Sequence, residues 1–201
     1  MQRRAVHGRQ VFVWSLSEGP AYDLSSPLVL GRVRGWLQGG LLAGIWIDLP
    51  ASLAGPGAPP SSVAVLRAAS VLLDVARRRG VPAGVLLPER AFGSARILSA
   101  AAARQDSVHV VRVDLCQHGS PARMRSRLIG VHLGLDGLGL TCTGRHGVCS
   151  ATGRHHSSSG HACMPFDLAR SVAARFEVAV ASLASAYFHD VILRRSQVDL
   201  R

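Results

Sequence analysis

Lysine is absent from this chain of 201 residues, so its 23 permanently positive side chains are all arginines. Acidic residues are few as well, at 12, and the formal net charge at pH 7 is +11. An excess of arginine is typical of proteins that bind nucleic acid, because guanidinium groups pair well with phosphate. The arginines are spread along the chain rather than gathered in one block, which instead favours a GC-rich coding sequence as their origin. Both interpretations stay open at this point.

Long apolar runs are also lacking. No window reaches the roughly 18 apolar residues of a membrane span, and no apolar run of signal-peptide length follows the N-terminal MQRRAVHGRQ. We therefore expect an intracellular protein, cytoplasmic or nuclear, with no membrane partner. The four cysteines are then more often free thiols or metal ligands than disulfides. P-loop, HExxH and Ser-His-Asp patterns are absent too, so none of those enzyme classes is favoured.

Strand-like and helix-like segments alternate, which predicts an α/β fold with a mainly parallel sheet covered by helices. A proline, Pro27, stands where a first helical residue is expected, and Gly80 follows a long amphipathic segment. We expect one domain over residues 1–187, with a Cys/His-rich insertion at about 138–163 and a charged tail over 188–201. The expected strands are 11–16, 43–49, 83–87, 107–115 and 127–133, and the expected helices are 28–38, 61–79, 94–104 and 165–187.

Cysteine and histidine gather in a stretch rich in Gly, Ser and Thr. Cys142 and Cys149 lie close in sequence, His155 and His156 follow them, and Cys116 precedes them at the end of an expected strand. Zinc prefers four nitrogen or sulfur ligands in a tetrahedron. The stretch has almost no apolar residues of its own, so a metal would supply folding energy that it otherwise lacks. The group is thus a candidate zinc site, and the alternative is buried thiols and loop histidines without a metal.

Five short segments are similar to motifs of DNA cytosine methyltransferases and stand in the same order. Over roughly residues 11–180 the chain resembles a divergent branch of that superfamily, which is encoded in mobile-element and protist genomes. The resemblance implies a Rossmann-like three-layer sandwich whose first strand, loop and helix are missing. The segments are VWSLSEGPAYDL, GIWIDLPASLAG, GVLLPERAF, VDLCQHGSPARMR and TCTGRHGVCSATGRHH.

The residues that this family uses for chemistry are replaced. The family carries Pro-Cys-x-Ser, whose thiolate attacks the pyrimidine ring, whereas this chain has Pro50, Ala51 and Ser52. A second family strand ends in Glu-Asn-Pro, whose acid contacts the ring, whereas the strand here ends with Leu86, Leu87 and Pro88. The resemblance therefore implies a catalytically inactive methyltransferase-like domain or fragment, derived from a mobile element.

The resemblance also bears on cofactors. S-adenosylmethionine is the family's cofactor, but no Phe-x-Gly-x-Gly segment precedes Val11, and we expect that the cofactor is not bound. Glu18, near the end of the first expected strand, is the remaining candidate for the ribose hydroxyls. Positions that recur in related domains give the preferred zinc ligands, with His155 or Cys163 as substitutes: Cys116, Cys142, Cys149 and His156.

A second function rests on three arginines. Arg123, Arg125 and Arg127 alternate, so on an extended segment they would point to one side. The family's Tyr-Gly-x-Pro motif lies close to its nucleic-acid substrate, and the stretch HGSPAR just before these residues resembles it. The alternative to an inactive methyltransferase-like domain is therefore a basic, zinc-stabilised module that binds nucleic acid through these arginines.

Overall fold

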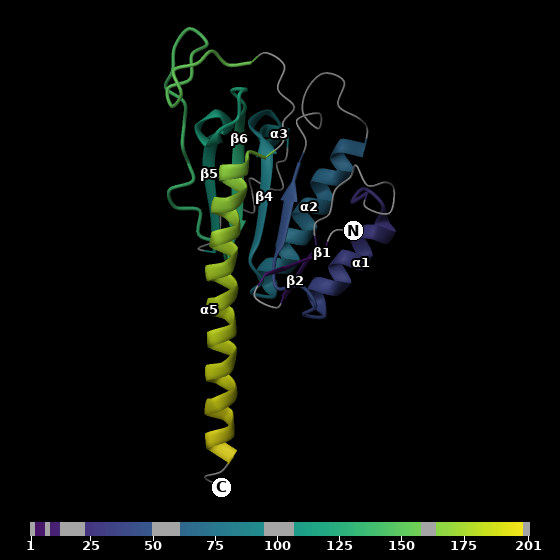
Figure 1. The fold of residues 1–201 in the computed structure, drawn as a ribbon. Helices are drawn as coiled ribbons and strands as arrows, with labels where there is room; N and C mark the ends of the chain where they lie inside the picture. The colour runs from purple at the N-terminus through teal and green to yellow at the C-terminus, as the bar shows by residue number, and fades with distance from the viewer. Residues whose placement is uncertain are drawn as a thin grey trace.

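The structure is a computed structural model that describes residues 3–6, 9–12, 23–49, 61–94, 107–157 and 164–198 (Figure 1). Helices and strands alternate along much of the chain, which confirms the expected α/β class. The strands are β1 (Arg3–Val6), β2 (Arg9–Phe12), β3 (Ile45–Asp48), β4 (Ala83–Pro88), β5 (Val108–Asp114) and β6 (Arg125–Val131). The helices are α1 (Pro27–Gln38), α2 (Ser61–Arg78), α3 (Glu89–Ser94), the 3-10 helix η4 (Leu115–His118) and α5 (Phe166–Val198).

Four strands form one open, mixed sheet in the order β3-β4-β6-β5, and β1 pairs with β2 in a separate antiparallel sheet. β3 and β4 run parallel, but β6 is antiparallel to both of its neighbours, β4 and β5. The prediction of a mainly parallel sheet is therefore wrong, and a Rossmann-like arrangement is not confirmed. The reason lies in residues 115–124, which join β5 to β6. A parallel return takes a crossover of about a dozen residues or more, so this connection is too short for one.

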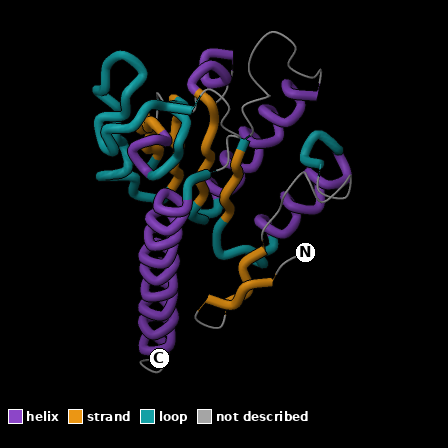
Figure 2. The backbone as a smooth tube through the Cα atoms, turned by 45° about the horizontal axis from the view of Figure 1, so that its top comes forward, coloured by secondary structure: helices purple, strands orange, loops and turns teal. Residues whose placement is uncertain are grey.

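Helices cover both faces of the four-stranded sheet (Figure 2). On one face, Leu37 of α1 and Leu72 of α2 belong to the same core cluster as Val85 of β4. On the other face, Leu168 of α5 packs in a cluster with Leu86 of β4. Successive side chains of a strand point to opposite faces, so the fully buried β4 contributes to both clusters. The result is a three-layer arrangement with the sheet in the middle.

Local signals set most of the helix ends. Pro27 is the first residue of α1, as predicted, and Gly80 follows α2 with a φ of +66°. α5 continues to Val198, beyond its predicted end at about residue 187, so the expected tail is helical up to that residue. α3 was not predicted. Residues 13–16 of one expected strand and 95–104 of one expected helix lie outside the described residues.

No helix in the described ranges combines the length and the apolar character needed to cross a membrane. α5 is the longest of them, and its N-terminal half lies against the sheet while the rest extends past it (Figure 1). Its Phe176 meets Trp46 of β3 edge to face, with ring centroids 6.3 Å apart. This aromatic contact fixes α5 on β3.

The Trp46 ring depends on a glycine beneath it. Gly84 is the cross-strand partner of Trp46, and a Cβ at Gly84 would lie 2.5 Å from two atoms of that ring. We predict that Gly84→Ala lowers the free energy of unfolding by about 1–3 kcal/mol, because the ring must move away from Phe176. Gly35→Ala, in open space on α1, should instead raise it by up to about 1 kcal/mol. Urea denaturation of both variants tests this, and equal effects would contradict the packing described.

Candidate metal centre

The Cys/His loop, which we define as residues 142–157, is brought to one end of the sheet by the segment before it. Residues 138–141 run beside the edge strand β5, where the Asp114 N–H donates to the Leu140 carbonyl oxygen at 2.8 Å. Asp114 ends β5, and Cys116 follows it within η4. The edge of the sheet thus places Cys142, the first cysteine of the loop, close to Cys116 despite their separation in sequence.

Two turns fold the Cys/His loop back on itself. In the first, the Val148 N–H donates to the Arg145 carbonyl oxygen at 3.0 Å. The central residues of this turn, His146 and Gly147, have φ of 52° and 78°. Positive φ at both central positions is characteristic of a type I′ turn. Val148 then forms an antiparallel bridge with His155, so the chain returns toward the cysteines.

The second turn begins at Cys149. Its N–H donates to the Arg154 carbonyl oxygen at 2.8 Å, and its own carbonyl oxygen accepts from the Gly153 N–H at 2.9 Å. Close packing of the two turns requires a glycine at position 144, because a Cβ on Gly144 would overlap the Val148 carbonyl oxygen. The many glycines of this loop, which look like a flexible segment in the sequence, therefore include positions that a compact loop requires.

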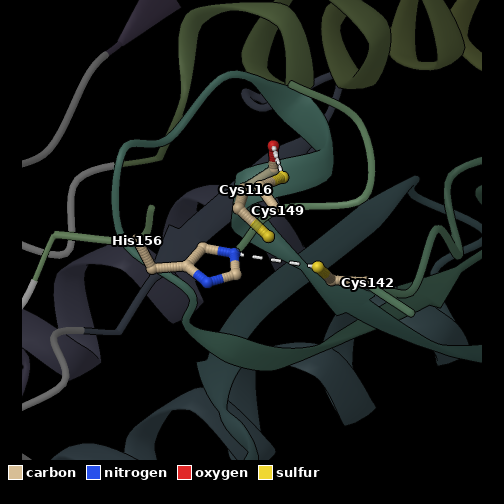
Figure 3. A group of neighbouring side chains, drawn as sticks. All are labelled: Cys116, Cys142, Cys149 and His156. Atoms are coloured by element: carbon tan, nitrogen blue, oxygen red, sulfur yellow. Dashed lines mark hydrogen bonds between the residues drawn. The ribbon is translucent and has the colours of Figure 1, made fainter. Parts of the chain in front are cut away.

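Four ligand-type side chains converge where the Cys/His loop meets η4 (Figure 3). Cys116, Cys142 and Cys149 are 1%, 4% and 4% exposed, and His156 is half-buried. The sulfurs and a ring nitrogen of His156 all lie within 4.8 Å of one another. These are the four residues named as preferred ligands from the sequence. The structure therefore contains a buried Cys3His cluster that could hold a metal ion.

The spacing of the ligand atoms is close to what a tetrahedral metal needs. Metal–sulfur and metal–nitrogen bonds of about 2.3 and 2.05 Å give tetrahedral edges of about 3.8 Å between sulfurs and about 3.6 Å between sulfur and nitrogen. The Cys142 Sγ and His156 Nε2 atoms are 3.7 Å apart. Contraction of the longer separations by about 1 Å would complete the tetrahedron, and the loop that carries three of the ligands can supply it.

The three thiols have different proton affinities. N–H donation from Ser150 is the main reason why the pKa of Cys142 falls to about 6, and the Gly144 N–H acts in the same direction. Burial raises the pKa of Cys116 to about 12. Burial also acts to raise the pKa of Cys149, but N–H groups of the turn that follows outweigh it and lower that pKa. Backbone N–H groups directed at sulfur thus prepare two of the three thiols as thiolates, the form that binds metals.

Two polar side chains contact the sulfurs from outside the ligand set. The Gln117 side-chain amide donates to the Cys149 sulfur at 3.6 Å, and its nitrogen also donates to the Ser150 hydroxyl at 3.1 Å. The Ser150 hydroxyl in turn donates to the Cys142 sulfur at 3.6 Å. Such contacts orient metal ligands and are a usual part of a metal site.

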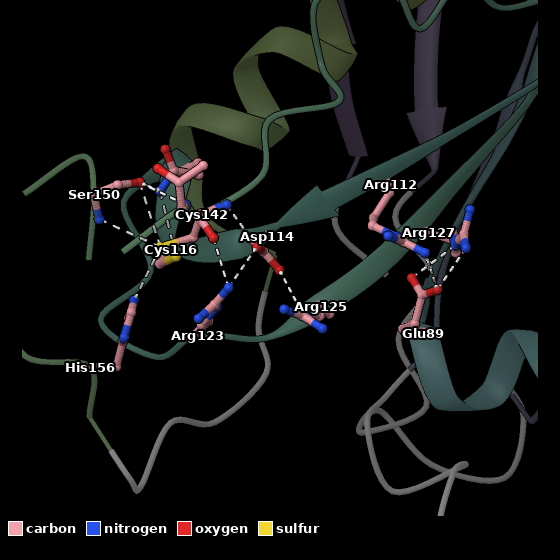
Figure 4. Close-up of polar contacts among 12 residues, drawn as sticks. Glu89, Arg112, Asp114, Cys116, Arg123, Arg125, Arg127, Cys142, Ser150 and His156 are labelled. Carbon is pink, nitrogen blue, oxygen red and sulfur yellow. Dashed lines mark hydrogen bonds and ion pairs between the residues drawn. The ribbon is translucent and has the colours of Figure 1, made fainter. Parts of the chain in front are cut away.

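A buried carboxylate holds Cys142 in place (Figure 4). Asp114 is 2% exposed, and its Oδ2 accepts the Cys142 N–H at 2.7 Å. Arg123 donates to the Cys142 carbonyl oxygen at 2.7 Å and lies 3.8 Å from the same carboxylate. Arg125 approaches the other oxygen of Asp114 at 3.8 Å. Both polar groups of the Cys142 backbone are therefore held by a charged side chain.

The third arginine of the predicted trio is paired elsewhere. Arg127 makes two hydrogen bonds to Glu89, at 2.8 and 2.6 Å, and Arg112 donates to the same carboxylate at 3.3 Å (Figure 4). Arg112 and Arg127 are direct cross-strand neighbours, an arrangement of like charges that is unfavourable unless an acid lies between them. Burial acts to raise the pKa of Glu89, but Arg127 and Arg112 outweigh it and lower that pKa. The arginines proposed as phosphate contacts are thus paired with carboxylates, and Arg125, with a side chain 61% exposed, is the most open of the three.

Other residues singled out in the sequence have varied positions. Leu86, at the position of the family's acid, is 3% exposed and packs in the core beneath α5, and Pro88 is buried at the end of β4. His155 is exposed and lies outside the Cys3His cluster. Five further residues fall outside the described ranges, so their predictions stay open: Glu18, Pro50, Ala51, Ser52 and Cys163.

Sequence reasoning missed the residues that support the ligands. Asp114, Gln117 and Ser150 were not considered, although Asp114 and Gln117 flank Cys116 closely and Ser150 directly follows Cys149. An acid at the end of an apolar strand, two residues before a ligand cysteine, is the signal that could have identified Asp114. The roles of Gln117 and Ser150 depend on the folded loop and leave no comparable signal.

Comparisons of the chain with models of protein families, with curated proteins and with solved structures gave no match. The chemistry of the site therefore has to be inferred from its own residues and geometry.

Asp114 offers a direct test of this geometry. Asp114→Asn keeps an acceptor for the Cys142 N–H but removes the charge that faces Arg123. We predict a loss of about 1.5–3 kcal/mol in the free energy of unfolding, the range for hydrogen bonds to charged groups. Asp74→Asn, which removes a half-exposed charge on α2, should change stability by no more than about 1 kcal/mol. Urea denaturation of the two variants measures the difference, and similar small effects would contradict the role given to Asp114.

The thiol pKa values predict how many protons a metal displaces. At pH 8 the Cys142 thiol, with a pKa of about 6, is already ionised, whereas Cys116, with a pKa of about 12, holds its proton. Zinc binding at pH 8 should therefore release about one to two protons, from Cys116 and in part from Cys149. Isothermal titration calorimetry in buffers of different ionisation enthalpy counts them. Release of three protons would show that the backbone N–H groups do not stabilise the Cys142 thiolate.

Proposed function

We propose that the Cys3His cluster binds one zinc ion as a structural site and that this domain has no catalytic activity of its own. The observation that carries the proposal is the convergence of four sulfur and nitrogen atoms within 4.8 Å of one another, three of them on buried residues. Catalytic zinc usually keeps one position open for water or substrate and has three protein ligands. A set of four protein ligands leaves no such position.

The donor set favours zinc over other common metals. Calcium and magnesium take oxygen ligands, and none of the four atoms here is an oxygen. Thiolate with imidazole in a tetrahedral arrangement suits zinc, which forms Cys3His sites in small structural modules. Zinc would also neutralise two of the three thiolate charges, so that burying three cysteines together becomes favourable.

A zinc ion here would replace the hydrophobic core that the Cys/His loop lacks. The buried residues of this region form a small cluster of Cys116, Cys142 and Cys149 alone, separate from the two clusters that flank the sheet. A bound metal would join η4 to both turns of the loop, segments that no strand pairing within the main sheet connects. Structural zinc supplies apparent binding energies of about 10 kcal/mol or more in small modules, which is enough to order a loop of this size.

The methyltransferase-like origin remains part of this proposal. Its support is the order of motifs in the sequence, together with the position of Leu86. The side chain at the place of the family's ring-contacting acid is buried in the core beneath α5, so it serves packing rather than a substrate. This supports an inactive domain or fragment of that family. The alternative function, a basic zinc-stabilised module that binds nucleic acid, is compatible with the same metal site.

Metal content tests the zinc proposal. Protein purified without chelator should contain one zinc ion per chain, and Cys149→Ser should lose it, because a hydroxyl is a poor replacement for a thiolate ligand. The matched control is His155→Ala, since His155 is a neighbouring histidine that is exposed and outside the cluster. This variant should keep its zinc. Inductively coupled plasma mass spectrometry measures the content.

Removal of the metal gives a second readout. A chelator should increase hydrogen exchange across residues 142–157 and leave β4, which is buried along its whole length, protected. Zinc-free protein with an equally protected Cys/His loop would contradict a structural role for the metal. Loss of zinc in the His155→Ala variant would show that the ligand set is wrong.

A further inference from the structure

Two arginines on the Cys/His loop differ from the other described arginines near the sheet. Arg145 and Arg154 are both exposed, and within the described part of the chain neither forms an ion pair with a carboxylate. The sequence has no acidic residue between Asp136 and Asp167, so no acid of this segment can neutralise them. The loop is therefore a local region of uncompensated positive charge.

Elsewhere the structure pairs its arginines with acids. Arg123 and Arg125 lie beside Asp114, and Arg112 and Arg127 share Glu89. Arg77 and Arg78 contact Asp74 on α2, at 3.1 and 2.6 Å. A phosphate would have to compete with a carboxylate at each of these positions. At Arg145 and Arg154 it meets no such competitor among the described residues.

The two turns hold Arg145 and Arg154 on one small surface. Arg145 opens the first turn, which returns to Val148, and Val148 is bridged to His155, the neighbour of Arg154. A Cβ at Gly147 would lie 3.8 Å from the His155 ring, so that ring lies over the first turn. Exposed histidines thus accompany both arginines. Arg154 is also fixed at its backbone by the hydrogen bond from Cys149.

The chemistry of this surface fits a nucleic-acid backbone better than other anionic partners. The exposed side chains of the loop are threonine, serine, histidine, arginine and one alanine. Hydroxyls and guanidinium groups are the donors that phosphates accept from in protein–nucleic acid complexes. A membrane-binding loop would carry exposed large apolar side chains to insert into the lipid, and this loop has none among its exposed residues. Small side chains between the arginines also allow a phosphate chain to approach closely.

We propose that the surface formed by Arg145 and Arg154 on the Cys/His loop binds nucleic-acid phosphates without reading sequence. This inference rests on the proposed zinc site, because the ligands Cys142, Cys149 and His156 hold the loop that carries both arginines. It also moves the contact away from Arg123, Arg125 and Arg127, the positions that the sequence favoured. The zinc ion itself would act only by fixing the loop.

The test compares two double variants that remove the same charge. Arg145→Ala with Arg154→Ala removes the proposed contacts, and Arg77→Ala with Arg78→Ala removes two arginines at the opposite end of the sheet, where α2 leads into β4. Binding of a fluorescein-labelled duplex of mixed sequence, about 20 base pairs long, is followed by anisotropy from about 50 to 200 mM NaCl. Zinc content is measured on every sample used.

We expect the loop variant to lose about tenfold or more in affinity at about 100 mM NaCl, with a log-log salt slope shallower by about 1.8, or 0.9 per phosphate. The α2 variant should keep the slope of the original chain. Equal losses in both variants would mean diffuse attraction by net charge and would overturn the inference. So would competition by polyglutamate as effective as that by unlabelled duplex, because it would identify the surface as a general acid-binding one.

The two proposals fail in different ways. Zinc-loaded protein that does not bind the duplex would overturn the phosphate surface and leave the metal site standing. Protein without zinc that still binds through Arg145 and Arg154 would overturn the structural metal and leave the surface standing. Chelator treatment that removes zinc and binding together, in protein with an intact sheet by circular dichroism, is the result that supports both.

Discussion

The hydrogen bond from the Cys142 N–H to the buried Asp114 carboxylate connects the sheet to the Cys/His loop. It joins the last residue of an edge strand to the first cysteine of the loop, at 2.7 Å. A buried carboxylate is stable only where hydrogen bonds and positive charge compensate its lost hydration. Arg123 and Arg125 supply that charge, and Arg123 also holds the other side of the Cys142 peptide. The geometry of the Cys3His cluster therefore depends on the end of β5 as much as on the cysteines.

The same constraint explains why the arginines of β6 have a structural role. In an extended strand Arg125 and Arg127 lie on one face, as alternation predicts, but that face also carries Asp114 and Arg112 from β5. Register places Arg125 opposite Asp114 and Arg127 opposite Arg112. Glu89, which begins α3, then relieves the contact between the two arginines. Sequence alternation could show that the arginines share a face, but not which partners the neighbouring strand and helix would bring.

Sequence reasoning was most successful where a local signal decides the structure. Pro27 and Gly80 mark helix ends as predicted, and the apolar run at Ala83–Pro88 is a strand buried along its length. The four cluster residues were also named, because cysteine and histidine are rare enough to stand out. Strand direction was wrong, since it depends on how β5 returns to β6 through residues 115–124. Second contacts such as Gln117 with Cys149 could not be predicted, because they exist only once the loop has folded.

X-ray absorption at the zinc edge of the purified chain tests the central claim most directly, since it reports the ligands around the metal itself. A structural Cys3His site predicts about three sulfurs near 2.3 Å and one nitrogen near 2.0–2.1 Å, with no water oxygen. The Cys116, Cys142, Cys149 and His156 cluster can supply that shell. A shell of oxygen and nitrogen atoms, or fewer than three sulfurs, would contradict the account, because the metal would then be bound elsewhere or at an open site.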